Sequence, residues 1–546
     1  MHITKLALKP WQMVLVLSAW LTFIYNGALL YSLPQSYQLT NINAVIAVTI
    51  VLFLLNGLVA AVLIWPRIWR FNAIIIIALS ALSFYFTQQY GVYIDSDMLI
   101  NVLETDWSES SALVTPALLI SLAMFAMLPG VLLYFIHIEW PQRYRHLVLQ
   151  QLLLVFGLLV GLATTAAIWY QPLSSLVRNH RELKHQVIPL NWMSASVSVV
   201  KSKAHLPAAY SDLTADARKT DVQPADNHRV MVLIIGETAR ADHFSINGYE
   251  RNTTPRLQQL VADGSVINFG AVAACGTATA ISLPCLLSYQ NRDQFDATTA
   301  RNSSNLLDVA QAAGYRVVWI DNNSGCKDMC NRVTAVDISR TNTDPLCAER
   351  DYCNDRILTR ALQQQLQSIN QDTLIVLHMI GSHGPAYYQR SLLTDKLFQP
   401  ECSSNSFDQC STEQIVNSYD NSLRSTDEVI AESILLLSQS NLETTLLYVS
   451  DHGESLGEYG TFLHGMPYWL APAAQREVPM LLWLSNSYQE NQQINRSCLI
   501  SAATAAVSHD NIFHSVLGLL EVTSPLYRAS LDLTHSCGQF DAHTTG

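Results

Sequence analysis

Hydrophobic and polar residues are distributed differently in the two parts of the chain. Residues 1–170 contain five uncharged apolar runs, each close to the roughly 20 residues that a membrane-spanning helix requires. The first run follows two lysines as a signal peptide does, but it is long for that role and has no clean small-x-small cleavage site. We therefore interpret it as a retained helix. The predicted spanning helices are Trp11–Leu33, Asn43–Trp65, Phe71–Ile94, Thr115–His137 and Leu147–Tyr170.

Basic residues between these helices set their orientation. They gather before the first helix, between the second and third, and between the fourth and fifth, so that side is cytoplasmic by the positive-inside rule. These residues are Lys5, Lys9, Arg67, Arg70, Arg143 and Arg145. The connection between the third and fourth helices carries Asp and Glu but no Lys or Arg. Five crossings then place everything after Tyr170 outside the cytoplasm.

Beyond residue 228 the pattern changes to short β-branched runs separated by longer helix-like segments. Strands that alternate with helices predict a mostly parallel sheet covered on both faces, as in an α/β sandwich. The predicted strands are Val230–Ile235, Val317–Ile320, Leu374–Leu377, Leu446–Val449 and Met480–Trp483. Residues 171–205 mix basic and apolar side chains and are either an interfacial amphipathic stretch or a solvated linker. The predicted domains are 1–170 (transmembrane), 171–228 (juxtamembrane and linker) and 229–546 (soluble).

Composition and cysteine content restrict the cellular compartments and the classes of binding partner that suit this chain. Charged residues make up 14% of the chain and the net charge is −12, which argues against a nucleic-acid binder. All ten cysteines lie after residue 274 in close pairs, which indicates disulfides and an oxidising compartment; free core thiols and a four-cysteine zinc site are the alternatives. Sequential pairing gives Cys275–Cys285, Cys326–Cys330, Cys347–Cys353, Cys402–Cys410 and Cys498–Cys537. Together with the charge pattern, this predicts a periplasmic domain.

Polar clusters follow four of the predicted strands. Glu237 comes after the first strand, residues 321–323 after the second, 378–383 after the third, and Asp451 with His452 after the fourth. Parallel sheets place their sites just beyond the carboxyl ends of the strands, so these clusters should meet. Two carboxylates and an imidazole suit zinc or manganese. The pattern therefore predicts an enzyme with a metal site built from Glu237, Asp451 and His452.

A loop between two cysteines, Cys275 and Cys285, supplies candidate nucleophiles. A hydroxyl beside a metal ion loses its proton more readily and becomes nucleophilic. Thr277, Thr279 and Ser282 all lie in this loop, and their residue types do not distinguish among them. All three also suit the capped start of a helix.

Five motifs, in order through residues 230–485, resemble those of the bacterial lipid A phosphoethanolamine transferases, the family that includes the mobile colistin-resistance enzymes. The five N-terminal helices also fit this family. The motifs are Gly236–Ser245, Cys275–Ala280, Gly381–Pro385, Ser450–Leu456 and Phe462–Gly465.

The resemblance implies an alkaline-phosphatase-like core and assigns roles to residues. Thr279 would be the nucleophile, and His383 and His464 would handle the substrate phosphate, a second metal or the leaving group. One zinc ion would be bound tightly by Glu237, Thr279, Asp451 and His452. Whether a second zinc ion binds is left open. Residues expected around the substrate are Thr277, Asn323, Ser324, Lys327, His378, His383 and His464; a core or capping role for His378 is the alternative.

The expected activity is transfer of phosphoethanolamine from phosphatidylethanolamine to a phosphate of lipid A, through a covalent intermediate on Thr279. The product would carry less negative charge and give polymyxin resistance. We expect a monomer in the inner membrane of a Gram-negative bacterium. The alternatives are another acceptor, such as a core sugar or a periplasmic glucan; a sulfatase or phosphomonoesterase, for which the C/S-x-P-x-R motif is absent; and a non-catalytic metal sensor.

Overall fold

The structure is a computed structural model that describes residues 6–36, 42–204, 209–220, 228–339, 344–348 and 352–538; Lys5 lies outside these ranges. The chain forms two compact units. The first is Met1–Leu99 with Val114–Val200, and the second is Ile100–Leu113 with Lys201–Gly546. The predicted linker, 171–228, is divided between them, because α10 (Tyr170–Asn179) and α11 (Leu190–Ala204) as far as Val200 belong to the first unit.

Apolar helices form the first unit, and they confirm four of the five predicted spans. Four helices in the described residues are long and apolar enough to cross a membrane, and a bent pair, Pro10–Tyr25 and Gly27–Gln35, makes a fifth if it is one span. The four are α3 (Ile42–Leu63), α4 (Trp69–Tyr90), Pro116–Tyr134, which comprises α7 and α8, and α9 (Tyr144–Ile168).

The 50° bend in the first span has a local cause at Asn26. The Asn26 amide nitrogen donates to the carbonyl oxygens of Leu21, at 2.8 Å, and Ile188, at 2.6 Å. Polar side chains that compete for backbone groups interrupt a helix in this way.

A seven-stranded sheet forms the centre of the second unit, in the order β5-β12-β9-β4-β8-β6-β7. The neighbours β9, β4, β8, β6 and β7 are parallel, whereas β12 is antiparallel to both β9 and β5. The strands are β4 (Arg229–Gly236), β5 (Val266–Ala273), β6 (Arg316–Asp321), β7 (Thr334–Asp337), β8 (Thr373–His378), β9 (Glu443–Ser450) and β12 (Glu477–Leu484). The mostly parallel sheet is confirmed, with β5 and β7 as additional strands.

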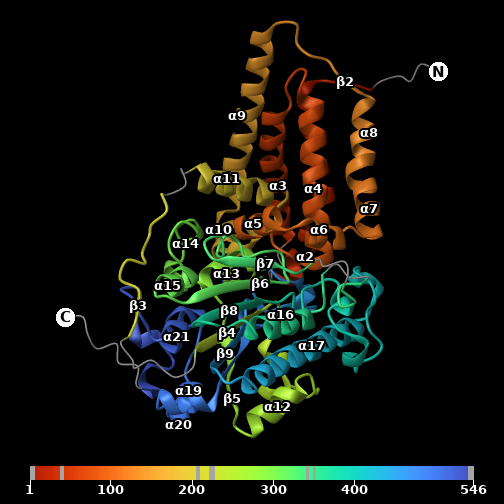
Figure 1. Cartoon of the computed structure of the whole chain (residues 1–546). Coiled ribbons are helices and arrows are strands. Elements are labelled where there is room, and N and C mark those ends of the chain that lie inside the picture. Colours follow the sequence, from red (N-terminus) through yellow and green to blue (C-terminus); the bar gives the residue numbers. More distant parts are fainter. Residues whose placement is uncertain are drawn as a thin grey trace. The chain divides into compact units, whose positions relative to one another are not determined.

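Helices cover both faces of this sheet, and the residues of β4 are buried on both sides. Met231, Leu233 and Ile235 share one core with residues of α15 (Leu306–Ala312) and α21 (Ile512–Leu519). The opposite face is covered by α16 (Arg356–Leu366) and by α17 (Thr412–Ser438), which pack against each other (Figure 1). This double cover explains why the strands are continuous apolar runs rather than alternating ones.

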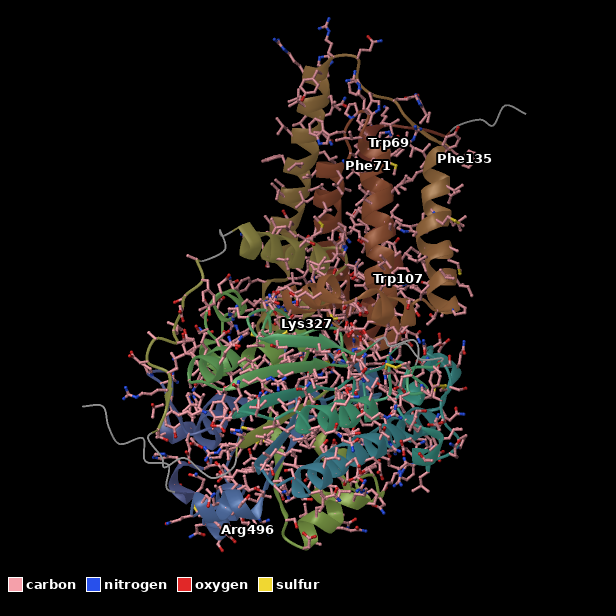
Figure 2. All side chains as sticks on the ribbon, viewed as in Figure 1. Trp69, Phe71, Trp107, Phe135, Lys327 and Arg496 are labelled. Atoms are coloured by element: carbon pink, nitrogen blue, oxygen red, sulfur yellow. A yellow bond between two sulfur atoms is a disulfide. The ribbon has the colours of Figure 1, made fainter. Side chains whose placement is uncertain are left out.

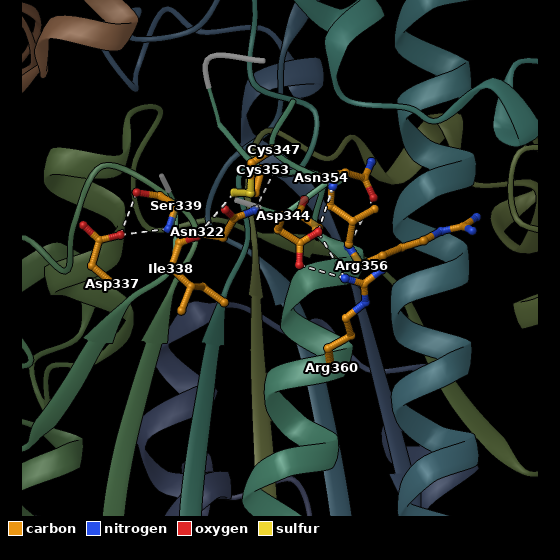
Figure 3. The surroundings of a disulfide bond; sticks show 12 residues. Asn322, Asp337, Ile338, Ser339, Asp344, Cys347, Cys353, Asn354, Arg356 and Arg360 are labelled. Carbon is orange, nitrogen blue, oxygen red and sulfur yellow. Dashed lines mark hydrogen bonds and ion pairs between the residues drawn. A yellow bond between two sulfur atoms is a disulfide. The ribbon is translucent and has the colours of Figure 1, made fainter. Parts of the chain in front are cut away.

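Five disulfides link the cysteines in the pairs that sequential pairing gives. Figure 3 shows Cys347–Cys353 beside the carboxyl end of β6. Asn322, which directly follows β6, donates from its amide nitrogen to the carbonyl oxygen of Cys353 at 2.9 Å. The Cys353 amide in turn donates to the carbonyl oxygen of Ser339 at 3.1 Å. The disulfide therefore fixes the chain at the sheet edge where the polar clusters lie.

Candidate metal centre and active site

The carboxyl ends of β4 and β9 bring three metal-ligating side chains together. The two strands are parallel neighbours, with Gly236 opposite Ser450, so the residues that follow them lie side by side. One ligand atom from each of Glu237, Asp451 and His452 lies within 4.8 Å of the others, and all three residues are buried. The His452 Nε2 atom is 3.3 Å from Glu237 Oε1 and 3.4 Å from Asp451 Oδ2.

The arrangement of donor atoms fits a metal ion. Asp451 Oδ2 is buried and makes no hydrogen bond, which is costly for a carboxylate oxygen unless a cation contacts it. His452 Nδ1 lies 2.9 Å from the carbonyl oxygen of Gly453, so the proton sits on Nδ1 and Nε2 is left as a ligand atom. Glu237, Asp451 and His452 together make the carboxylate and imidazole donor set typical of zinc.

Electrostatics at the centre favour positive charge. Burial would raise the pKa of Glu237, but the hydrogen bond and charge of His452 hold it well below its usual range. Burial and the charge of Glu237 raise the pKa of Asp451 to about 7. Burial would lower the pKa of His452, but the two carboxylates raise it to about 10. A site that stabilises the imidazolium form so strongly would also stabilise a bound cation.

Thr279 is the hydroxyl that reaches this centre. It is the first residue of α13 (Thr279–Leu286), and its Oγ1 lies 3.1 Å from Glu237 Oε2 and 3.4 Å from His452 Nε2. The amino end of a helix carries free N–H groups and a partial positive charge, which stabilise an anion. Thr279 is thus beside both the metal-ligating groups and a helix terminus suited to a phosphate.

The two other hydroxyl candidates in the loop point elsewhere. Thr277 Oγ1 donates to the carbonyl oxygen of Met466 at 2.6 Å, and the Gly465 amide donates to the Thr277 carbonyl oxygen at 2.7 Å. Ser282 Oγ donates to the carbonyl oxygen of Asp451. Thr277 therefore joins the loop to the segment after His464, and Ser282 joins α13 to the end of β9.

A buried histidine that sequence reasoning missed holds the nucleophile loop. The Cys275 amide donates to His509 Nδ1 at 3.1 Å, and His509 Nε2 lies 3.0 Å from the carbonyl oxygen of Ser450. Burial lowers the pKa of His509 to about 3, so the ring is neutral with its proton on Nε2. His509 comes from a 3-10 turn more than 200 residues after the loop, so no local sequence pattern indicates it.

Asn323 and His378 lie behind the metal-ligating residues. The Asn323 amide nitrogen donates to Glu237 Oε2 at 2.9 Å and to the carbonyl oxygen of Met379 at 2.7 Å. His378 is fully buried, with Nδ1 3.2 Å from Asp321 Oδ2 and Nε2 3.4 Å from the Asn323 amide nitrogen. His378 thus belongs to the network that orients Asn323 and, through it, Glu237.

Close backbone packing also fixes Glu237. Gly381 has a φ of 51°, and a Cβ atom there would lie 2.5 Å from the Glu237 carbonyl oxygen. The Ser382 amide donates to the same oxygen at 3.0 Å. Only glycine allows this approach, which explains its place in the motif that follows β8.

His383 and His464 lie together next to the centre. Their ring centroids are 5.3 Å apart, and the His464 ring is 4.5 Å from that of His452. His464 Nδ1 lies 2.8 Å from Glu454 Oε2, while Tyr387 donates to Glu454 Oε1 at 2.5 Å. Glu454 thereby fixes the ring of His464 with Nε2 free, a role that the sequence pattern did not reveal.

Ser324 and Lys327 lie outside the metal cluster, along the loop after β6. Lys327, labelled in Figure 2, donates to Ser324 Oγ at 3.0 Å and to the carbonyl oxygen of Glu104 at 3.5 Å. Glu104 and Glu109 belong to the segment Ile100–Leu113, which falls in this unit although it lies among the apolar helices in sequence. Glu109 Oε1 is 4.0 Å from His383 Nε2, a second contact that sequence reasoning missed.

Comparisons with known families and proteins agree with this geometry. The family described as "Sulfatase" matches residues 229–522, and "Phosphoethanolamine transferase EptA/EptB" matches residues 51–204. Phosphoethanolamine transferase EptA of Escherichia coli K12 is 36% identical over 528 residues, covering 95% of each chain. Phosphatidylethanolamine transferase Mcr-1 of Escherichia coli is 33% identical, covering 95% of this chain and 96% of its own.

Solved structures show the same architecture. The integral membrane protein lipooligosaccharide phosphoethanolamine transferase A from Neisseria meningitidis superposes with a TM-score of 0.91 at 33% identity, covering 96% of this chain and 98% of its own. The periplasmic domain of EcEptC from Escherichia coli, solved in complex with Zn, shares the fold at 20% identity and a TM-score of 0.50, covering 62% of this chain and 92% of its own. The chain belongs to the EptA/Mcr family of phosphoethanolamine transferases, within the sulfatase and alkaline phosphatase superfamily.

Proposed function

We propose that this protein transfers phosphoethanolamine from phosphatidylethanolamine to a phosphate of lipid A, with Thr279 as the nucleophile. The observation that carries the proposal is the position of Thr279 Oγ1, 3.1 Å from Glu237 and 3.4 Å from His452 at the amino end of α13. A membrane-anchored enzyme with a periplasmic domain suits this reaction because both donor and acceptor are lipids.

The side chains around Thr279 form a ligand set for a metal ion. Glu237, Thr279, Asp451 and His452 would hold one zinc ion, which when bound favours the alkoxide form of Thr279 and withdraws charge from the phosphoryl oxygens. Asp451 Oδ2, which makes no hydrogen bond, and His452 Nε2, which faces Glu237 and Asp451, support this ligand set. Asn323 donates to the Glu237 carboxylate, and Gly381 packs against the Glu237 backbone, so together they hold this residue in place.

In the first half of the reaction Thr279 Oγ1 attacks the donor phosphorus. The Oγ1–P bond forms and the bond from phosphorus to the diacylglycerol oxygen breaks. That oxygen takes a proton from His383 or His464; His464 offers Nε2, because its Nδ1 is held by Glu454 at 2.8 Å. The free N–H groups of α13 stabilise the charge on the phosphoryl oxygens.

In the second half a lipid A phosphate oxygen attacks the same phosphorus, and the bond to Thr279 Oγ1 breaks. Splitting the transfer into two displacements replaces one difficult encounter of two lipids and an enzyme by two sequential ones. We also propose that Thr277, Ser324 and Lys327 contribute to substrate binding. The amine on the product offsets a negative phosphate, which weakens binding of cationic polymyxins.

Mass spectrometry of lipid A tests the proposal. Wild type, Thr279→Ala and Thr279→Ser are expressed in a polymyxin-sensitive Gram-negative host, and membrane levels of each are matched. We expect a phosphoethanolamine adduct with wild type, none with Thr279→Ala and a reduced amount with Thr279→Ser, which keeps a hydroxyl. Lipid A unchanged in the wild-type strain would overturn the lipid A assignment and direct the search to core sugars and periplasmic glucans.

A further inference from the structure

Arg301 connects two parts of the second unit that are far apart in sequence. It is the last residue of α14 (Ala297–Arg301), and its guanidinium group binds the Glu104 carboxylate with both terminal nitrogens, at 2.5 and 2.9 Å. A bidentate pair of this kind is stronger and more directional than a single contact. Both side chains are only 22% exposed, so solvent screens the pair less than it screens a surface pair.

The same guanidinium group also forms a hydrogen bond with α13, the helix that begins at Thr279. A proline, Pro284, lies inside α13, and it has no N–H group to donate to the carbonyl oxygen of Ala280 four residues earlier. Arg301 Nη2 donates to that oxygen at 3.1 Å. Ala280 directly follows Thr279, so Arg301 fills the missing hydrogen bond in the turn that presents the nucleophile.

On its other side, Arg301 holds the segment Ile100–Leu113 in place. Besides His383, three other side chains of the unit contact this segment. Lys327 donates to the Glu104 carbonyl oxygen at 3.5 Å, Tyr352 to Asp106 Oδ2 at 2.8 Å, and Asn405 to the Ala112 carbonyl oxygen at 3.1 Å. Arg301 also donates to a carbonyl oxygen of α13, that of Ala280.

We propose that Arg301 is a positioning residue that couples the Ile100–Leu113 segment to the first turn of the nucleophile helix. Its pair with Glu104 keeps Glu109 beside His383, at 4.0 Å, while its bond to Ala280 orients Thr279. The proposal rests on the proposed function, since it takes Thr279 as the nucleophile and His383 as part of the site. An ion pair that only stabilises the fold would not link the position of the Ile100–Leu113 segment to that of Thr279.

A double-mutant cycle in the full-length protein tests the coupling. Arg301→Ala, Glu104→Gln and the double variant are compared for the initial rate of diacylglycerol release from fluorescent phosphatidylethanolamine. We expect each single change to lower the rate roughly five- to tenfold, with Arg301→Ala the more severe because Ala280 also loses its partner. The double variant should be no slower than Arg301→Ala, because both changes break one connection. The proposal would be overturned if the rate losses of the two single variants multiplied in the double variant, or if each single variant kept a rate within about twofold of wild type.

Hydrogen exchange provides a readout that does not depend on activity. In Arg301→Ala and Glu104→Gln, backbone amides of Ile100–Leu113 should exchange at least several-fold faster, while the strands of the sheet keep their protection. The control is Arg256→Ala, which breaks ion pairs with Glu428, at 2.8 Å, and Glu432, at 3.7 Å, and it should leave the exchange of the segment unchanged. Unchanged exchange of the segment in Arg301→Ala would overturn the coupling. This result does not depend on the lipid A assay, so the coupling and the proposed function can fail separately.

Discussion

The helix α9 of the first unit and the strand β4 of the second are both apolar, yet they expose their side chains in opposite ways. In α9, Leu152 and Phe156 are 62% and 66% exposed. In β4 every residue from Val230 to Ile235 is fully buried. Lipid takes the place of a protein core around α9, whereas helices cover both faces of β4. Apolar runs of different length therefore predict different environments, about 20 residues for the bilayer and six to eight for a covered sheet.

Buried polar groups are also distributed differently in the two units. In the first unit they are spread along the helices, as when the Asn56 amide nitrogen donates to Thr22 at 2.9 Å. In the second unit they gather at one edge of the sheet, and Asp451 keeps an oxygen without a hydrogen bond. Two buried carboxylates and an imidazole meet at this edge, and such a cluster of titratable side chains marks a ligand site, which is why the chemistry is assigned to the second unit.

The largest effect is expected from the metal-ligating carboxylate. Asp451→Asn removes a charge from the centre and should lower bound zinc and reduce transfer by about a thousandfold, equivalent to roughly 4 kcal/mol. Zinc content is measured by elemental analysis and transfer with fluorescent phosphatidylethanolamine. The control is Asp427→Asn, an equally buried carboxyl that accepts from two backbone amides of α12 (Pro255–Ala262). It should change neither quantity; loss of zinc in both variants would contradict a specific site.

Truncating one leucine in each unit sharpens the contrast of environments. Leu233→Ala leaves a cavity in the sheet core and should lower the free energy of unfolding by about 3 kcal/mol. Leu152→Ala removes a side chain that is largely exposed on α9, and in lipid it should change stability by less than about 0.5 kcal/mol. Thermal unfolding in nanodiscs measures both. Equal losses would contradict the assignment of α9 to the lipid-facing surface.

Two glycines separate backbone strain from crowding at the site. Gly314 has a φ of 95° and an open space around its missing Cβ, so Gly314→Ala should cost about 1 kcal/mol of stability from strain alone. Gly381→Ala adds a clash with the Glu237 backbone, so it should cost about 2 kcal/mol and also lower zinc affinity. Zinc titration distinguishes the two variants. Normal zinc affinity in Gly381→Ala would show that Glu237 does not depend on this contact.

The smallest effect concerns pH and lies away from the site. His514 accepts a hydrogen bond from the Arg528 amide at 3.1 Å, and burial with the charge of Arg528 lowers its pKa from 6.5 to about 4. The unfolded chain therefore binds a proton that the folded one does not between pH 6.5 and 4, so stability is full above 6.5 and falls as pH drops through this window. His514→Asn should lower the slope of the unfolding free energy against pH in this window by about 1 kcal/mol per pH unit, as measured by thermal unfolding at several pH values. An unchanged slope would mean that His514 is not protonated on unfolding.

Local patterns in the sequence were enough to predict the spans and the main strands, but not every strand. β5 and β7 were not predicted, and each has a physical reason. β5 contains Gly270 with a positive φ and several partly exposed residues, and all four residues of β7 are exposed at the sheet edge. Neither presents the apolar run that a doubly covered strand requires.

The candidate site divides in a similar way. Glu237, Asp451 and His452 each follow a strand, so the topology of a parallel sheet brings them together without knowledge of side-chain packing. His509, Glu104 and Arg301 come from turns and helices distant in sequence, and only tertiary packing places them. The choice among the loop hydroxyls likewise depends on where α13 begins, which residue types do not reveal.

Mass spectrometry of the enzyme itself tests the central claim, that Thr279 carries the transferred group. Wild-type protein is incubated with phosphatidylethanolamine and no acceptor, then digested and sequenced. We expect a phosphoethanolamine adduct on Thr279 that disappears when lipid A is added. An adduct on Thr277 or Ser282, or diacylglycerol release with Thr279→Ala at the wild-type rate, would contradict it.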